Sequence, residues 1–438
     1  MGSNPTFPMS AAAGGATPFA AGPLRGELRV AGDKSISHRA LMLGAAARGT
    51  TRIIAPNRGA DVFATRDAVV ALGAHVTDDG DDFVITGGTL RDPAQTIDAR
   101  NSGTTTRLLA GLCAGSGVTA TFDGDDSLRR RPMERVARAL RALGAVVETA
   151  EGRLPITVRG ISNLAGGTYA LEVPSAQIKS AILLAHLRAT ERVVVTGDAR
   201  SRDHTERMLA HFGRTILFDG RATQLEPGRL VARDVRVPGD LSAAAFFLIG
   251  ATVARGSNLL LRDVGVNPTR TGVLDALVAM GGDVTIERAR ERDGEPVADL
   301  RVRSAPLRAI EIDGAYVVRA IDEIPVLAVA AAFATGTTRI RDAAELRAKE
   351  SDRLRATAIV LRACGIEVTE HPDGLDIVGG APQLPETPLP VFDDHRIAMA
   401  IAVLAAGANG GSIERADAIA VSFPEFADRW SGAQRGRP

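Results

Sequence analysis

One pattern recurs along the whole chain: a polar turn followed at once by an Ala-rich, apolar helix. Its copies read AGDKSISHRALMLGAAA, ARNSGTTTRLLAGLCAG, EVPSAQIKSAILLAHL, RVPGDLSAAAFFLIGA, RAIDEIPVLAVAAAFA and VFDDHRIAMAIAVLAAG. They follow one another at intervals of roughly 65 to 85 residues, as expected of a repeated folding unit. Because a helix that is apolar on all sides offers no face to water, these helices must lie in the interior of the fold.

Most copies continue into a short β-branched run and then into a more charged, amphipathic helix such as KESDRLRATAIVLRACGIEV. In that helix Leu354, Ala358 and Leu361 share one face, and Gly365 supplies the C-terminal stop. Six such units indicate an α/β (α+β) protein with two similar domains of three units each. The strands are expected to gather into sheets that flank or enclose the apolar helices.

The length of 438 residues also favours two domains, since it exceeds what one hydrophobic core usually organises. We expect the boundary between the third and fourth copies, near ARDVRVPGD. The first domain is then predicted to cover residues 31–236, and the second to combine residues 23–30 with residues 237–438. Residues 1–22 are rich in Ala, Gly and Pro and lack Lys and Arg, so we interpret them as a flexible extension and not a signal peptide.

The overall charge argues against partners that are recognised through a global electrostatic field. The 52 basic and 52 acidic residues balance, so neither nucleic acid nor an anionic membrane surface is expected as a partner. The longest apolar run, AMAIAVLAAGA, is shorter than the roughly 18 residues of a membrane span. Cys113 and Cys364 lie in apolar stretches without a partner at ligand spacing, which favours buried thiols in a reducing compartment such as the cytoplasm.

The repeated turns are the candidate sites of chemistry, because the free N–H groups at a helix start favour anions. In GDKSISHRALMLG, Ser35 is placed to cap the helix and shares a face with Arg39, with Lys34 just ahead of both. An anion site and a capped helix with solvated cations explain this segment equally well. The P-loop spacing GxxxxGK[ST] is absent. In NSGTTTRLL, Gly103 would allow a ligand close to the backbone, although a simple turn explains it as well.

Other helix starts are open to the same two interpretations. The basic triplet that ends in Arg131 precedes Pro132, which suits a first helical turn, and it fits either an anion site or a solvated corner. Ser175 and Gln177 offer neutral hydrogen-bonding groups at the start of a further apolar helix, and SRDHTERML offers Arg202. Each of these signals is weak by itself.

Acidic residues at two further positions are candidates for proton transfer. Asp322 and Glu323 open an otherwise apolar helix, where an acid without a partner would be costly. A helix cap explains one of them and a catalytic base the other. In ELRAKESDRLRATA, Lys349 and Arg353 are predicted on one helical face, which suits a salt-bridged surface helix as well as a site. No metal site is predicted, because the 7 His residues are scattered.

Taken together, GDKSISHRAL, NSGTTTR, RRRPMERV, PSAQIKSAILL, SRDHTE, IDEIPVLAVAAAFA, KESDRL, DDHRIAMA and SFPEF resemble the enolpyruvyl transferase family. The resemblance extends in order from about Leu24 to about Trp430. It implies the two-domain fold of that family, an inside-out α/β barrel with three folding units in each domain. It also implies transfer of the enolpyruvyl group of phosphoenolpyruvate to the 5-hydroxyl of shikimate 3-phosphate by a cytoplasmic monomer, without metal or organic cofactor.

Roles for individual residues are carried over only from that resemblance. The expected shikimate 3-phosphate contacts are Lys34, Ser35, Arg39, Ser175, Gln177, Arg202, Asp322 and Lys349. The expected phosphoenolpyruvate contacts are Lys34, Gly103, Arg131, Gln177, Arg353 and Arg396. Asp322 is expected to accept the proton of the attacking hydroxyl, and Glu350 is expected to protonate the methylene carbon. Lys34 is expected to assist at the phosphate or as an acid or base.

The chain departs from the family pattern at three positions. Ala176 stands where a second Ser is common, Glu345 where many members have Asn, and Val421 where many have Lys. Substrate contacts at these three positions are therefore not predicted. Gly103 further implies a phosphoenolpyruvate pocket that is open to glyphosate, because a methyl group at that position narrows the pocket in this family.

Two alternatives fit the sequence less well. The branch of the family that uses UDP-N-acetylglucosamine usually has Lys-Asn in its first motif and a reactive Cys in a mobile loop. Here Lys34 is followed by Ser35, and no Cys lies between residues 119 and 131. A non-catalytic binding homologue would be expected to lose Asp322 or Glu350, and both are present.

Overall fold

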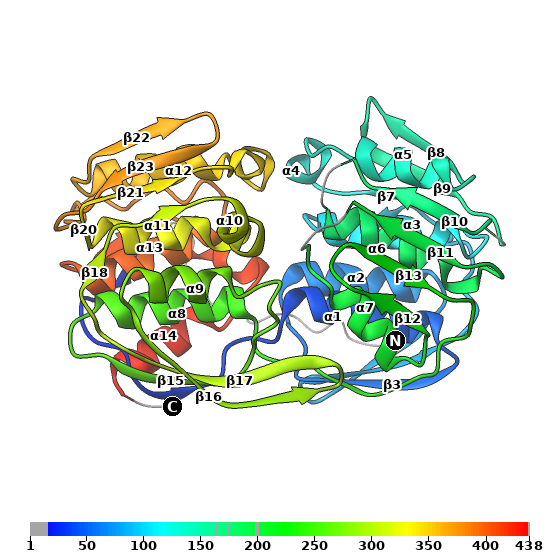
Figure 1. Cartoon of the computed structure of the whole chain (residues 1–438), viewed down its shortest axis with the longest axis horizontal. Helices are drawn as coiled ribbons and strands as arrows, with labels where there is room; N and C mark the ends of the chain where they lie inside the picture. Colours follow the sequence, from blue (N-terminus) through cyan, green and yellow to red (C-terminus); the bar gives the residue numbers. More distant parts are fainter. Residues whose placement is uncertain (1–15, 163, 173–174, 198–200, 437–438) are drawn as a thin grey trace.

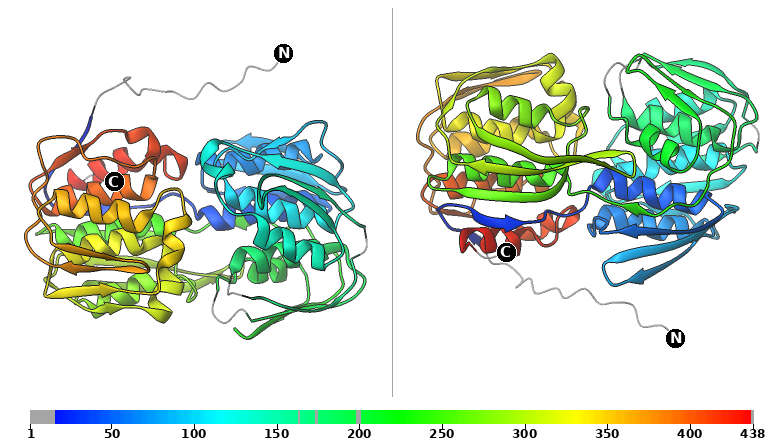
Figure 2. Two further views of the ribbon diagram at one scale, coloured as in Figure 1. Left: turned by 90° about the horizontal axis from the view of Figure 1, so that it is seen from above. Right: turned by 60° about the horizontal axis from the view of Figure 1, so that its bottom comes forward.

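The computed structural model describes residues 16–162, 164–172, 175–197 and 201–436. These residues form two lobes that lie side by side (Figure 1), and Figure 2 shows the same arrangement from two further directions. Each lobe has its own buried core. The core of the first lobe runs from Ile36 to Val237, and that of the second lobe combines a segment around Leu24 with residues from Leu241 to Ala433.

The first lobe contains inner and outer helices and twelve strands within the described ranges. Its helices are α1 (Lys34–Ala46), α2 (Ala60–Ala71), α3 (Gly103–Ala114), α4 (Asp126–Arg129), α5 (Glu134–Ala142), α6 (Ala176–Ala185), η1 (His186–Arg188) and α7 (His204–His211). Its strands are β3 (Gly49–Ile54), β4 (His75–Asp79), β5 (Asp82–Gly87), β6 (Ile97–Asp98), β7 (Thr119–Asp123), β8 (Val146–Ala150), β9 (Arg153–Arg159), β10 (Gly167–Ala170), β11 (Val193–Thr196), β12 (Ile216–Phe218), β13 (Ala222–Leu225) and β14 (Val235–Arg236).

The second lobe also takes in the described N-terminal strands. Its helices are α8 (Leu241–Val253), α9 (Gly272–Ala279), α10 (Gly314–Ala320), η2 (Ile321–Glu323), α11 (Ile324–Ala332), η3 (Ala344–Ala348), α12 (Arg353–Ala363), α13 (His395–Gly407), η4 (Ala416–Val421) and α14 (Phe426–Gln434). Its strands are β1 (Thr17–Phe19), β2 (Arg25–Leu28), β15 (Asn258–Gly265), β16 (Asp283–Arg292), β17 (Glu295–Arg303), β18 (Leu307–Arg308), β19 (Glu311–Ile312), β20 (Ala334–Thr335), β21 (Thr337–Ile340), β22 (Val368–His371), β23 (Gly374–Val378) and β24 (Gly411–Ile413).

The repeat seen in the sequence corresponds to one sheet topology. Among the described residues, five four-stranded sheets have the orders β14-β3-β5-β4, β6-β7-β9-β8, β10-β11-β13-β12, β2-β15-β17-β16 and β19-β21-β23-β22. In each of them the first two strands pair parallel and the others antiparallel. The sixth copy is reduced, since β24 pairs with β1 and is followed by η4 and α14 in place of a hairpin.

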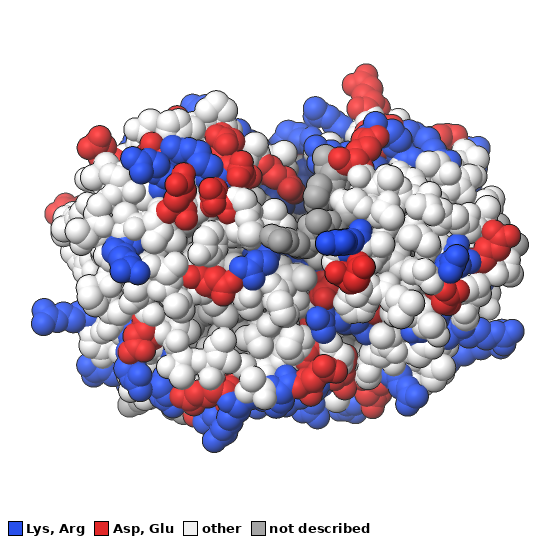
Figure 3. Space-filling view, viewed as in Figure 1, with Lys and Arg blue, Asp and Glu red and all other residues white. Residues whose placement is uncertain are grey.

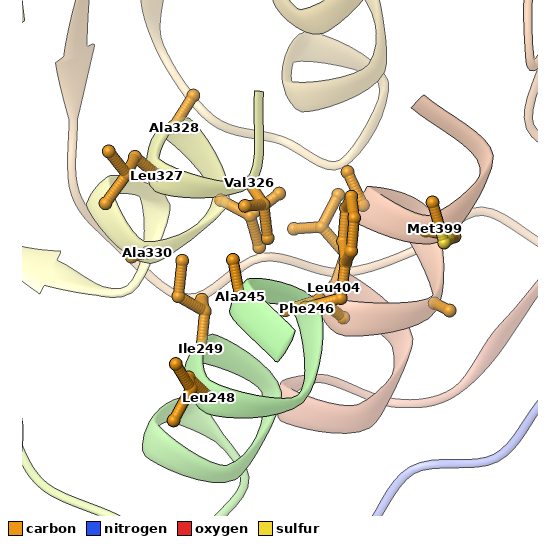
Figure 4. Packing of buried hydrophobic residues seen from close by; sticks show 14 of the residues in the cluster. Ala245, Phe246, Leu248, Ile249, Val326, Leu327, Ala328, Ala330, Met399 and Leu404 are labelled. Carbon is orange, nitrogen blue, oxygen red and sulfur yellow. The ribbon is translucent and has the colours of Figure 1, made fainter. Parts of the chain in front are cut away.

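The apolar helices lie inside the lobes, as their sequences predict. In the second lobe α8, α11 and α13 pack against one another, with Phe246, Val326 and Leu404 among the side chains that meet between them (Figure 4). In the first lobe α3 approaches α6 so closely that a Cβ on Gly111 would lie 2.3 Å from the carbonyl oxygen of Ala181. Small residues in these helices therefore set the distance between them. No helix in the described part of the chain is long and apolar enough to cross a membrane.

The expected N-terminal extension is too long. Strand β1 pairs antiparallel with β24, and Phe19 is buried with its ring centroid 6.4 Å from that of Phe426. The amide of Gly22 donates to the carbonyl oxygen of Ala406 at 3.0 Å. Residues 17–22 therefore belong to the second lobe, because Phe19 is buried in its core and β1 is hydrogen-bonded to its strand β24. Residues 1–15 lie outside the described residues.

The chain crosses between the lobes twice, and the two crossings lie side by side. The amide of Asp33 donates to the carbonyl oxygen of Pro238 at 2.8 Å, and that of Asp240 donates to Ala31 at 2.8 Å. Strand β2 pairs with β15 in the second lobe, and β14 pairs with β3 in the first. On this basis we propose two domains, residues 31–236 and residues 23–30 with 237–438, the second of which also takes in β1.

The long hairpin β16–β17 adds a further link between the lobes, and its tip reaches α7 (Figure 1). There the guanidinium of Arg207 donates to the carbonyl oxygen of Gly294 at 3.0 Å, and His204 Nδ1 lies 2.8 Å from Glu295 Oε1. The hairpin therefore fixes α7, and with it the segment just before α7, relative to the second lobe.

Candidate active site

The inner helices begin with side chains that cap their first free amides. Asp33, Ser102, Ser175, Asp240 and Asp394 accept hydrogen bonds at the starts of α1, α3, α6, α8 and α13. The sequence interpretation of Ser35 as the cap of α1 is wrong. The backbone of Asp33 is extended and its carboxylate accepts from the Ile36 amide at 2.9 Å, so Ser35 already lies within the helix.

Lys34 is the first residue of α1 and lies where the two lobes meet. Its amide donates to Asp240 Oδ2 of the second lobe at 3.1 Å, and its Nζ donates to Asp61 Oδ2 of α2 at 2.9 Å. Its side chain is 19% exposed, so the ammonium group is accessible while its backbone is held from across the lobe boundary.

Arg39 is buried one helical turn after Ser35 and joins three elements of the first lobe. Its guanidinium donates to Thr205 Oγ1 at 2.7 Å, to Ser180 Oγ at 2.9 Å and to the Ser35 carbonyl oxygen at 3.0 Å. Burial lowers the pKa of Arg39 to about 10, which still leaves it charged at neutral pH. In the absence of substrate Arg39 thus ties α1 to α6 and α7, and its expected contact with shikimate 3-phosphate stays a prediction.

Gly103 and Gln177 are neighbours through a third residue that the sequence reasoning did not select. Arg107 of α3 donates to Gln177 Oε1 at 3.1 Å and to the carbonyl oxygen of Pro132 at 3.1 Å. The amide of Gln177 donates in turn to Thr104 Oγ1 at 3.3 Å. Arg107 and Thr104 of α3 therefore hold both ends of the Gln177 amide. Arg107 is the last residue of the motif NSGTTTR, and its place in that motif could have marked it as a site residue.

Arg131 brings the first lobe to the second. Its guanidinium donates to the side chain of Asn101 at 2.5 Å and to that of Ser127 at 3.3 Å, while Nη1 lies 3.8 Å from Glu350 Oε1. The two charged side chains are only 10% and 17% exposed. This largely buried ion pair joins the two lobes, so residues of both contribute to one site.

Asp322 is the centre of the cluster and is surrounded by cations from both lobes. Its Oδ2 lies 2.5 Å from Arg202 Nη2 of the first lobe, and its Oδ1 lies 3.4 Å from Arg353 and 3.7 Å from Lys349. Arg396 of α13 donates to the carbonyl oxygen of Asp322 at 2.9 Å. Five of the expected site residues therefore meet at one point.

The second acid of the cluster, Glu350, lies on the other side of Arg353. Arg353 Nη2 is 2.5 Å from Glu350 Oε2, and Arg353 Nε donates to Asp394 Oδ2 at 2.8 Å. The guanidinium of Arg353 therefore lies between the carboxylates of Asp322, Glu350 and Asp394 and pairs with all of them. The prediction that Lys349 and Arg353 share a helical face is wrong. Helix α12 begins only at Arg353, and Lys349 lies before it in an extended conformation.

The expectation that one acid caps α11 is also wrong. The backbone of Glu323 precedes α11, but its side chain makes no capping hydrogen bond. Instead Ser242 Oγ donates to Glu323 Oε1, and Arg270 Nη2 lies 3.5 Å from the same oxygen. Pro325 occupies an early helical position and has no amide to cap, which leaves Glu323 free to pair elsewhere.

These cations control the acidity of both carboxyl groups. Burial would raise the pKa of Asp322, but Lys349 and Arg202, with the other arginines, hold it well below its usual range. Burial likewise opposes ionisation of Glu350, but Arg353 and Arg131 with the other nearby cations together outweigh it and hold that pKa well below its usual range. Both groups are therefore carboxylates in the ligand-free protein.

The arrangement suits small molecules with several negative charges. In the space-filling view the outline of the molecule is notched between the lobes, and Lys and Arg side chains lie beside the notch on the first lobe (Figure 3). Lys34, Arg353 and Arg396 stand in the first turns of α1, α12 and α13, where the positive end of the helix dipole adds to the preference for anions. Among the described residues, no group of three or more His, Cys, Asp and Glu side chains could hold a metal ion.

Comparison with known proteins assigns the chain to a family. The sequence model of EPSP synthase (3-phosphoshikimate 1-carboxyvinyltransferase) matches residues 19–430. The chain belongs to the EPSP synthase family. A 3-phosphoshikimate 1-carboxyvinyltransferase of Thermosynechococcus vestitus is 50% identical over 92% of this chain and 94% of its own, and one of Geotalea uraniireducens is 47% identical over 92% and 95%.

Solved structures of EPSP synthases and their relatives share the fold. EPSP synthase from Acinetobacter baumannii has a TM-score of 0.84 at 39% identity, with 95% of this chain and 98% of that chain covered. The enolpyruvyl transferase NikO from Streptomyces tendae has a TM-score of 0.77 at 18% identity, with 95% and 96% covered, which shows the fold alone. The predicted two-domain enolpyruvyl transferase fold and the resemblance to the family are thus confirmed.

Proposed function

We propose that this member of the EPSP synthase family transfers the enolpyruvyl group of phosphoenolpyruvate to the 5-hydroxyl of shikimate 3-phosphate and releases phosphate. One observation carries the proposal: Asp322 and Glu350 lie within one cluster of cations that both lobes supply, with Arg202 and Arg131 reaching them from the first lobe. Full-length relatives that bear the name of this activity, at 50% identity, support it.

Electrostatics explains why such a cluster is needed. Phosphoenolpyruvate and shikimate 3-phosphate each carry a phosphate and a carboxylate, and the reaction requires them side by side. Two like charges at 4 Å repel by roughly 4 kcal/mol at an effective dielectric constant of about 20. Arg131, Arg353, Arg396 and Lys34 offset that repulsion, and the buried setting strengthens their effect.

In the proposed reaction the 5-hydroxyl oxygen attacks the phosphate-bearing carbon of phosphoenolpyruvate. The hydroxyl proton passes to Asp322, and a proton from Glu350 goes to the methylene carbon, which gives a tetrahedral addition intermediate. The methyl group then returns a proton to Glu350 as the bond to phosphate breaks, and the double bond forms again. The proton that Asp322 accepted goes to the departing phosphate, which restores the Asp322 carboxylate, and Lys34 assists by neutralising the charge of that phosphate.

In the ligand-free site Asp322 and Glu350 are both ionised, so the scheme requires that substrate binding change their protonation. A carboxylate whose pKa lies well below its usual range is a poor base, and Glu350 has no proton to give. The anionic groups of the substrates compete for the same arginines and lysines, so binding weakens the hold of Lys349 and Arg353 on the two acids. Substrate binding therefore raises both pKa values toward the range that proton transfer requires.

The other expected contacts are part of the same proposal. Ser35, Arg39, Ser175, Gln177, Arg202, Asp322 and Lys349 would contact shikimate 3-phosphate together with Lys34, and Gly103, Arg131, Gln177, Arg353 and Arg396 would contact phosphoenolpyruvate. We further propose a cytoplasmic monomer that needs no metal or organic cofactor. The free and buried state of Cys113 and Cys364 agrees with a reducing compartment.

The test is phosphate release from phosphoenolpyruvate with either shikimate 3-phosphate or UDP-N-acetylglucosamine as acceptor. We expect turnover with the first alone. Asp322→Ala and Glu350→Ala should fold and bind but lose most turnover, because both positions are proposed to move protons. Asp376→Ala is the matched control, since that acid pairs with Arg341 at 2.6 Å outside the cluster, and it should keep wild-type activity. Turnover with UDP-N-acetylglucosamine alone, or full activity of both site variants, would refute the proposal.

A further inference from the structure

Beside the two crossings between the lobes lie three buried acids and a buried arginine that the proposed reaction does not use. Asp33 and Asp240 belong to the crossings themselves, and Glu323 and Arg270 come from the second lobe. Arg270, from the loop before α9, is only 4% exposed. Its Nη1 lies 3.6 Å from Asp33 Oδ2, and its Nη2 lies 3.6 Å from Asp240 Oδ1 and 3.5 Å from Glu323 Oε1. Its Nη2 also donates to Ser242 Oγ at 2.6 Å. One guanidinium therefore stands between three acids from three separate segments.

Each of these acids is connected to a residue of the candidate active site. The carboxylate of Asp240 uses both oxygens as acceptors, Oδ1 from the Ser242 amide at 2.8 Å and Oδ2 from the Lys34 amide at 3.1 Å. Asp33 caps the helix that Lys34 begins. Glu323 follows Asp322 in the chain and lies 3.7 Å from Arg396.

We propose that Arg270 is a positioning residue, which keeps these acids ionised and thereby holds Lys34 of the first lobe in place relative to Asp322 of the second. The inference rests on the proposed function only for the roles of these two residues. The dependence follows from hydrogen-bond chemistry. Protonation of Asp240 turns one oxygen into a hydroxyl donor and a much weaker acceptor, so the hydrogen bond from either the Lys34 amide or the Ser242 amide weakens.

The surroundings make Arg270 the main counter-charge of the three acids. Burial raises the pKa of Asp33, and the nearby Asp240 raises it further, while Arg270 opposes both. The other charged groups that act on the cluster are His204, Asp322 and Arg396. An opposite charge at this distance shifts a carboxyl pKa by about 1 to 3 units, so its removal should bring one of the three acids toward neutral pH.

The test uses Arg270→Gln, which removes the charge and keeps most of the volume. We expect the acid limb of its kcat/KM profile to move upward by about one pH unit or more, with the alkaline limb unchanged. Arg270→Lys keeps the positive charge, so the acid limb of its kcat/KM profile should stay at the wild-type pH. Arg270→Gln/Asp33→Asn removes one acid together with the cation and retains a good cap, so its limb should return toward the wild-type position. The double variant also serves if Arg270→Gln alone does not fold.

Thermal unfolding supplies a readout that does not need turnover. Without Arg270 the pKa of Asp33, which burial already raises, should rise further, and the pKa of Asp240 should rise as well. Stability is then lost as the pH rises from the unfolded pKa values to the folded ones. The deficit in Tm of Arg270→Gln should therefore widen from pH 5 to pH 8. Arg214→Gln is the matched control, because Arg214 is equally buried but donates to the carbonyl oxygens of Leu187 and Glu226. Its deficit should not change with pH.

Two results would overturn the inference. One is an Arg270→Gln profile that runs parallel to that of the wild type, and the other is a Tm deficit as independent of pH as that of Arg214→Gln. Either result would make Arg270 a merely structural residue. If the wild type fails to turn over shikimate 3-phosphate, the proposed function fails, whereas the unfolding experiment still decides whether Arg270 keeps the acids ionised.

Discussion

Gly103→Ala tests how closely the start of α3 is built around Arg107. A Cβ on Gly103 would lie 2.6 Å from Arg107 Nη1 and 3.6 Å from Leu128 Cδ1. An ordinary contact requires about 3.4 Å, so the guanidinium nitrogen must move by about 0.8 Å. The atom that must move is the one that donates to Gln177 Oε1 at 3.1 Å. We therefore expect the new methyl group to act on Gln177 through Arg107.

The size of the effect follows from that displacement. A displacement of about 0.8 Å is large against the narrow range of hydrogen-bond lengths, so we expect it to disrupt the bond from Arg107 to Gln177. A hydrogen bond to a charged group contributes about 1.5–3 kcal/mol, so kcat/KM should fall by roughly 10- to 150-fold. The fall should involve both substrates, because Gln177 is proposed to contact both. If the same methyl group narrows the phosphoenolpyruvate pocket, the inhibition constant for glyphosate should rise more than KM.

The assay is steady-state phosphate release with each substrate varied in turn, with and without glyphosate. Gly380→Ala is the matched control, because its Cβ would meet only Ile366 Cδ1 at an ordinary 3.6 Å. A double-mutant cycle with Arg107→Lys isolates the mechanism, since lysine has no atom at the position of Nη1 and should reduce the cost of the methyl group. Values of kcat/KM within twofold of wild type for Gly103→Ala, or equal costs in both backgrounds, would refute the reasoning.

Two further predictions concern stability. Because the folded pKa of Asp322 is depressed, its carboxylate stabilises the fold above the ordinary value of 3.8 and this contribution disappears as the pH falls. Asp322→Asn should therefore be less stable than wild type in urea at pH 7, with a difference that shrinks below pH 3.8, and a constant difference would contradict this. Glu206→Gln should lower the free energy of unfolding by about 3–5 kcal/mol in the same assay, because it leaves the buried charge of Lys179, 2.5 Å away, without its carboxylate. The double variant Lys179→Met/Glu206→Gln removes both charges and should recover most of that loss.

Local sequence patterns were enough to predict an α/β protein with two similar domains, while the barrel arrangement came from the family resemblance. Apolar residues on all sides of the repeated helices predicted their interior position. The amphipathic pattern from Leu354 to Leu361 ends at Cys364, and Gly365 follows with a φ of 80°, as the C-terminal stop requires. Where two neighbouring polar residues compete for one role, the pattern failed. Ser35 and Asp33 both suit a cap, and only the backbone conformation decides between them.

The sequence could not predict which charges neutralise each other, because ion pairs in this site join residues from distant segments. Arg202 pairs with Asp322, and Arg131 pairs with Glu350, across the lobe boundary. Neither pair has a spacing that a periodicity could reveal. The resemblance to known enzymes named these residues individually, but their mutual distances follow only from the way in which the two lobes meet.

The same reasoning explains why Arg270 is absent from any local motif of the site. Its three acids stand at the starts of inner helices from both lobes, where each acid alone would be interpreted as a cap or a surface group. The chain segments cross where the amide of Asp33 donates a hydrogen bond to the carbonyl oxygen of Pro238. There the three carboxylates come within 3.6 Å of the guanidinium of Arg270. A site assembled from repeated helix starts collects anion-binding amides and also concentrates acids. A buried cation beside the crossing offsets this concentration of acids, and that is the role we propose for Arg270.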